Sequence, residues 1–195
     1  MADRTLKLPA DFDPKSQFAV AQMLAALDDQ LEILEGAACT LSVSQLEWQP
    51  SPGTNTIGML LAHMAVAECY WLSVVPREIP LEPDGEQLVE KIVGIRMADD
   101  GFPLAAEGQH PESLKGKKAA DYFTLLRAAR KASHDVLRGW RDDALDRLHP
   151  LRNRRASRHW ILYHTLEHTI SHIGQVFALR QTMRREGIIQ GEFRH

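Results

Sequence analysis

The sequence has little net charge and no long hydrophobic run. Lysine and arginine number 23 against 26 acidic residues, and the resulting net charge of −3 points to neither nucleic acid nor an anionic membrane as a partner. The longest apolar stretch, 57–67, contains His63 and is shorter than the ~20 residues that a transmembrane helix needs. We therefore expect no membrane span and no nucleic-acid binding.

Cysteine is also scarce, with only Cys39 and Cys69. Their number and spacing do not provide a disulfide or zinc framework. The N-terminal residues carry charges with no apolar segment behind them, so no secretory signal is expected. Both observations favour a cytoplasmic protein. At 195 residues, of which 44% are hydrophobic and 25% charged, the chain is long enough to bury a core as a single domain over residues 1–195.

The apolar residues recur with a helical period in four long segments. Residues three or four positions apart lie on one face of an α-helix, and no segment shows the alternation typical of a strand. The sequence predicts an all-α four-helix bundle, with the fourth helix buried around most of its circumference because its apolar residues cover more than one stripe. The expected helices span residues 13–36, 55–75, 119–140 and 158–186.

The segment 76–118 is rich in proline and glycine, and only 87–95 within it is expected to form a short helix. Such a long irregular stretch is uncommon in a compact domain. We interpret it as a crossover connection between the second and third helices. Residues 141–157 are expected to form a second loop.

Histidine is the most informative residue type. The fourth expected helix carries His159, and then His164, His168 and His172, each four residues after the last. A step of four residues advances by only ~40°, so these three imidazoles form a slowly turning column with ~6 Å between neighbours. Two histidines at this spacing can offer two nitrogens to one tetrahedral metal ion.

His63 lies on an inward-facing line of the second expected helix. A buried imidazole needs partners, because an unsatisfied polar group in a core costs ~1 to 3 kcal/mol. A metal ion held by the histidine column opposite would satisfy one ring nitrogen. Alternatively, His63 binds no metal and donates to a backbone carbonyl, to Glu167 or to Glu68.

Two helical phrases resemble the DinB/YfiT-like family: IGMLLAH at 57–63, with Glu68 and YWL at 70–72 after it, and HTLEHTISHIGQ at 164–175. The resemblance covers nearly the whole chain. It implies an up-down-down-up bundle in which His63, His168 and His172 bind one divalent metal ion, usually zinc or nickel. His164 then has a supporting role, and three neutral imidazoles leave the open position of a catalytic metal site.

The family includes thiol-dependent S-transferases and isomerases, whose metal activates a low-molecular-weight thiol such as mycothiol, bacillithiol or glutathione. The resemblance therefore implies a homodimeric, metal-dependent enzyme that acts on a small molecule in detoxification or stress response. One alternative is a metal-dependent hydrolase that uses hydroxide on the metal. The other is a non-enzymatic bundle or ligand-binding module with a histidine network in its core.

Glu68 and Gln175 are the further candidates for a catalytic role. Glu68 lies on a largely apolar line of its helix, where a carboxylate could orient a ligand histidine or act as a general base. The other interpretation is that its carboxylate reaches solvent at the helix edge. Gln175, three residues after His172, shares the face of that histidine and could hydrogen-bond a group on the metal.

A run of arginines precedes the fourth expected helix. We interpret it as a solvated loop, because it lacks interleaved aromatic residues, with recognition of an anionic substrate as the minor alternative. The tryptophans are expected to serve as core or interface anchors. The arginines are Arg152, Arg154, Arg155 and Arg158, and the tryptophans are Trp48, Trp71, Trp140 and Trp160.

Overall fold

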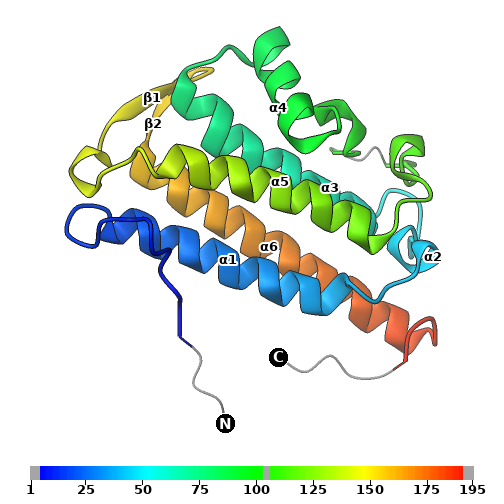
Figure 1. Ribbon diagram of the computed structural model, residues 1–195. Helices are drawn as coiled ribbons and strands as arrows, with labels where there is room; N and C mark the ends of the chain where they lie inside the picture. The colour runs from blue at the N-terminus through cyan, green and yellow to red at the C-terminus, as the bar shows by residue number, and fades with distance from the viewer. Residues whose placement is uncertain (1–4, 103–105, 191–195) are drawn as a thin grey trace.

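A computed structural model describes residues 5–102 and 106–190, and it confirms the all-α prediction (Figure 1). Helix α1 packs against α5 and α6, and α3 packs against the same two helices. In Figure 1, α1 and α6 run from left to right, whereas α3 and α5 run from right to left. The long helices are α1 (Phe18–Ala38), α3 (Ile57–Cys69), α5 (Ala119–Leu137) and α6 (Arg158–Arg185), and the short α2 (Val43–Leu46) follows α1.

The expected crossover between the second and third long helices is present. Beyond α3 the chain continues through a π-helical turn, η1 (Tyr70–Val74), and a 3-10 turn, η2 (Val75–Arg77). The short helix expected at 87–95 corresponds to α4, which contacts both α3 and α5. The remaining elements of the crossover are η3 (Leu81–Gly85), α4 (Glu86–Val93), η4 (Met97–Asp99) and η5 (Glu112–Leu114).

The observed helix ends differ in part from the predicted ones. Helix α1 begins at Phe18 rather than at residue 13, because the Asp13 carboxylate accepts hydrogen bonds from Lys15 N and Ser16 Oγ in a preceding turn. Thr56 caps α3 by accepting a hydrogen bond from Met59 N, which settles the choice left between residues 55 and 56.

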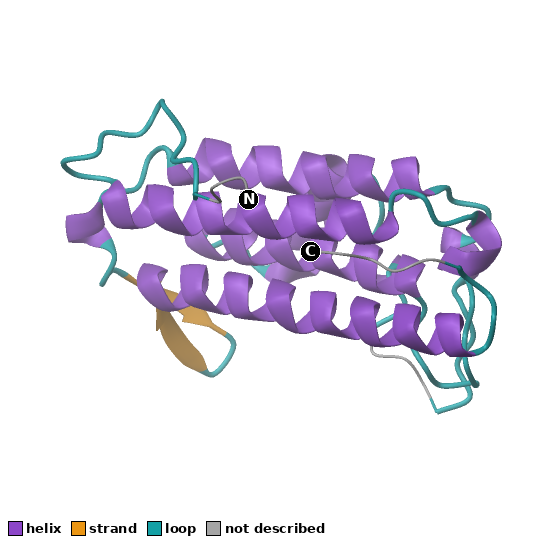
Figure 2. Cartoon of the chain, turned by 90° about the horizontal axis from the view of Figure 1, so that it is seen from below, coloured by secondary structure: helices purple, strands orange, loops and turns teal. Residues whose placement is uncertain are grey.

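Residues 148–157 form a β-hairpin, so the expectation of a loop without strands was wrong. Strand β1 (Leu148–Leu151) pairs antiparallel with β2 (Arg154–Ser157), and a 3-10 turn, η6 (Asp142–Ala144), precedes them. Figure 2 shows the hairpin projecting from the end of the bundle where α6 begins. Strands of four residues with three arginines at and beside their turn carry too few apolar positions to show the alternation expected of a strand.

Helix α3 lies at the centre of the bundle. All of its residues are buried except His63, which is partly exposed. The helical stretch Ile57–Arg77 is long and apolar enough to span a membrane, which the shorter run at 57–67 did not predict. However, 83% of its most apolar window is buried against the rest of the protein, as in the core helix of a soluble protein.

Helix α6 is buried along one face only, contrary to the expectation for the fourth helix. Ile161, Thr165 and Ile173 are among its buried residues. Tyr163 and Ile170 on another face are 56% and 47% exposed. The apolar residues of α6 are therefore not all buried, and the helix presents a partly apolar face outward.

Candidate metal centre

Three imidazoles converge between α3 and α6. The Nε2 atom of His168 lies 3.2 Å from the Nε2 atoms of both His63 and His172. One ligand atom from each of the three residues lies within 4.8 Å of the other two, and all three side chains are partly buried. The structure thus brings together the three histidines that the resemblance singled out. We call His63, His168 and His172 the histidine triad.

Hydrogen bonds on the far side of two rings set their orientation. The Nδ1–H of His63 donates to Asp100 Oδ2 over 2.9 Å, and the Nδ1–H of His172 donates to Gln175 Oε1 over 3.1 Å. A neutral imidazole that donates from Nδ1 carries a lone pair on Nε2. Both rings therefore turn an electron pair toward His168, which is how ligand histidines are held in metal sites.

The segment that follows η4 closes one side of the triad. Asp100 is buried, and its second oxygen accepts a hydrogen bond from Phe102 N at 2.8 Å. The Phe102 ring stacks on the His63 ring with 4.0 Å between centroids. Neither the carboxylate nor the aromatic ring was predicted, because both lie in the irregular crossover, where helical spacing gives no information about which side chain reaches the site.

The environment favours the unprotonated form of His168 and His172. Burial, reinforced by the neighbouring imidazoles of His172, His63 and His164, lowers the pKa of His168 to about 3. Burial also lowers the pKa of His172, although its hydrogen bond to Gln175 acts in the opposite direction. Near neutral pH these rings are therefore in the form that binds metal ions.

The triad fits a divalent metal ion. Nitrogens that share a tetrahedral zinc ion at ~2.0–2.1 Å lie about 3.3 Å apart, close to the two 3.2 Å separations observed here. Imidazole is a ligand for zinc, nickel and other divalent metals, so the donor set selects a group of metals rather than one.

His164 lies beside the triad rather than in it. Its Nδ1 contacts Glu167 Oε2 at 3.2 Å, so Glu167 pairs with this ring and not with His63. The imidazole stacks on Trp160, with 4.6 Å between ring centroids, and meets the edge of Trp71 at 4.7 Å. Its centroid is 6.0 Å from that of His168. His164 thus connects the triad to two tryptophans.

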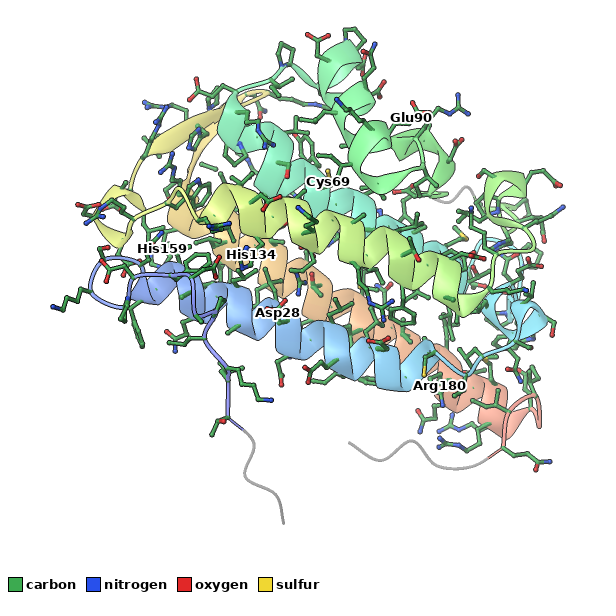
Figure 3. The ribbon with its side chains drawn as sticks, viewed as in Figure 1. Asp28, Cys69, Glu90, His134, His159 and Arg180 are labelled. Atoms are coloured by element: carbon green, nitrogen blue, oxygen red, sulfur yellow. The ribbon has the colours of Figure 1, made fainter. Side chains whose placement is uncertain are left out.

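Glu68 is directed away from the triad, toward Arg130 on α5. Its carboxylate accepts hydrogen bonds from Arg130 Nε and Nη2 at 2.8 and 3.0 Å, and Arg130 Nη1 donates to Asp28 Oδ1 at 2.6 Å. Figure 3 shows Asp28 on the side of α1 that faces α5. Glu68 is only 4% exposed, so the expectation that it reaches solvent was wrong. Asp100 is the carboxylate that orients a triad histidine, and Glu68 neutralises a buried arginine.

The two cysteines remain unpaired. Cys69 is buried, and burial raises the pKa of its thiol to about 12, so it is unreactive at neutral pH. Cys39 follows α1 and is exposed. Neither belongs to the described cluster of metal-ligating groups, which contains histidines only.

Comparison with known proteins identifies the fold and the family. A family model of the DinB superfamily matches residues 9–176. A conserved protein from Enterococcus faecalis has a solved structure with a TM-score of 0.58 and 18% identity, covering 82% of this chain and 93% of that one. A DinB-like protein from Bacillus cereus gives a TM-score of 0.51 and 18% identity, covering 85% and 91%. No curated protein matches the sequence. The match over most of the chain shows that this protein belongs to the DinB superfamily.

Proposed function

We propose that His63, His168 and His172 bind one divalent metal ion, zinc or nickel, and that the protein is a metal-dependent enzyme. The observation that carries the proposal is the proton count of the triad. When the three rings are neutral and the Nδ1–H groups of His63 and His172 are donated outward, the three Nε2 atoms share at most one proton, on His168. One proton serves only one of the two 3.2 Å contacts well, whereas a cation satisfies all three nitrogens.

The donor set also favours a catalytic role over a structural one. A divalent ion held by three neutral imidazoles keeps its charge and an open coordination position, and it makes a bound thiol or water acidic enough to ionise near neutral pH. Other residues of the chain hold the ligand histidines in position. Asp100 and Gln175 hold two of the rings, and Phe102 covers one of them.

The activity that the family resemblance favours is transfer of a low-molecular-weight thiol to a small electrophile, in detoxification or stress response. In such a reaction on a chloro-dinitro-arene, the thiol releases its proton to solvent, a carbon–sulfur bond forms, and the carbon–chlorine bond then breaks as chloride leaves. Turnover that requires added thiol supports this activity, whereas thiol-independent cleavage of esters or amides supports a hydrolase.

A homodimer and a cytoplasmic location are part of the same proposal, and the exposed Tyr163 and Ile170 give α6 an apolar face for a second copy.

Metal analysis of protein purified without a histidine tag tests the proposal. We expect about one equivalent of zinc or nickel in the wild type and loss of most of it in His168→Ala, because two nitrogens bind an ion far more weakly than three. The control is His159→Ala, an exposed histidine of the same helix outside the triad (Figure 3). It should keep its metal. Equal, sub-stoichiometric metal in all three proteins would favour a non-enzymatic histidine network.

A further inference from the structure

A cleft of about 560 Å³ lies between the π-helical turn η1 and the turn of the β-hairpin. Its apolar wall includes Trp71, Leu81 and Met97, and its polar wall includes Arg152 and Arg154. The cleft and the triad share structural neighbours. Trp71 contacts His164, the neighbour of His168, and Met97 begins the 3-10 turn that leads to Asp100. The cleft is therefore connected to the triad through His164 and through the turn that leads to Asp100.

The two arginines on the polar wall are available for a ligand. Among residues 5–102 and 106–190, neither Arg152 nor Arg154 forms an ion pair, and both are exposed. The nearby Glu78 is already engaged by His149 and Arg147. Arg154 is held with its guanidinium 5.1 Å from the centroid of the Trp160 ring. Guanidinium groups that lack a carboxylate partner, at the edge of an aromatic cleft, match the planar geometry of a carboxylate.

The cleft does not reach the triad directly. Trp71, in η1, follows His63 by eight residues, which at ~1.5 Å per residue corresponds to about 12 Å along the helical stretch that continues α3. A ligand that contacts both places must therefore be elongated. Its charged end and its reacting end are separated by an apolar body that can pack on Trp71 and Met97.

We infer that this cleft selects substrates with a carboxylate at one end and an aromatic or extended apolar body. Arg152 and Arg154 bind the carboxylate, and the other end of the substrate faces the triad. The part of the inference that concerns the reacting end rests on the proposed metal-dependent function. Binding of the carboxylate by the two arginines in the cleft does not depend on that proposed function.

Calorimetric titration with 2-naphthoate and its neutral analogue 2-naphthamide tests the inference. We expect 2-naphthoate to bind the metal-loaded and the chelator-treated wild type equally well, and 2-naphthamide to bind at least tenfold more weakly. Arg152→Gln and Arg154→Gln should each weaken binding of the carboxylate by roughly tenfold, the usual loss for one charge-assisted hydrogen bond. Arg155→Gln is the matched control, because this exposed hairpin arginine does not line the cleft. It should bind like the wild type.

Several results would overturn the inference, and they separate it from the metal proposal. Equal binding of the carboxylate and the amide, or no binding of either, would show that the cleft does not select charge. Tighter binding of 2-naphthoate upon metal loading, unaffected by Arg152→Gln, would place the carboxylate on the metal instead of the arginines. A protein that contains no metal but binds 2-naphthoate through the arginines would refute the proposed function and support the cleft.

Discussion

Asp100 is the residue on which the geometry of His63 depends, although it lies outside every long helix. Its buried carboxylate accepts the Nδ1–H of His63 and the backbone N–H of Phe102. We expect Asp100→Asn to lower metal affinity by about 10- to 100-fold, because the amide keeps the shape but loses the charge that makes His63 a better ligand. Competition for zinc against a chelating dye measures this change.

The neighbouring residue provides the control for this prediction. Asp99 pairs with the exposed Arg96 and has no contact with the triad. Asp99→Asn should therefore bind zinc like the wild type. If Asp100→Asn also bound zinc with unchanged affinity, the aspartate would have only a structural role in the crossover.

Residues within helices were predictable from the sequence to the extent that helical spacing determines their position. The four-residue repeat of His164, His168 and His172 places them on one face before any tertiary contact is known. The partner of Glu68 could not be predicted in this way. Arg130 follows it by 62 residues on another helix, and only the packing of α3 against α5 brings the two charges together. The same limit applies to Asp100, which reaches His63 from an irregular segment.

Among the secondary-structure elements, the hairpin is one that the sequence did not predict, and a buried histidine attaches it to the bundle. His149 in β1 is fully buried. Its Nδ1 contacts Glu78 Oε1 at 3.2 Å, and its Nε2 accepts a hydrogen bond from Arg158 Nε at 3.3 Å. The hairpin is thus joined both to the end of the helical segment that follows α3 and to the beginning of α6.

This attachment should weaken in acid. Burial, together with the positive charges of Arg158 and Arg147, lowers the pKa of His149, and the contact with Glu78 opposes that shift only in part. In an unfolded chain a histidine takes up a proton near pH 6.5, whereas folded His149 takes it up at a lower pH. The stabilisation is therefore complete above about pH 6.5 and is lost as the pH falls below that value.

Hydrogen exchange of the hairpin amides measures this effect, after correction for the intrinsic rate. We expect residues 148–157 to be less protected at pH 5.5 than at pH 7.5, and α1, which contains no histidine, to serve as the internal reference. The difference should disappear in His149→Gln. Persistence of the pH dependence in that variant would assign it to another group.

For the whole molecule, the sequence predicted the bundle because four segments with apolar residues at helical spacing must bury those residues against one another. The resulting core consists of two clusters of buried side chains, one that includes Leu60 and Phe123 and one that includes Leu24 and Ile161. Together the two clusters contain residues from all four long helices. We therefore expect the bundle to fold without a metal ion, in contrast to small domains that are unfolded without one.

Removal of the proposed metal ion should therefore abolish the proposed activity and leave the fold in place. An ion present at about 100 times its dissociation constant stabilises the folded state by about 2.7 kcal/mol. For a protein of this size each kcal/mol changes the melting temperature by about 2 to 4 °C, so a chelator should lower it by about 5 to 10 °C. Thiol-dependent turnover should vanish, and helicity at 25 °C should not change.

His168→Ala should show no effect of the chelator on its melting temperature, because its site no longer retains the ion. Loss of helicity on chelation would instead mean that the ion holds α3 and α6 together, and that the apolar core alone does not maintain the bundle.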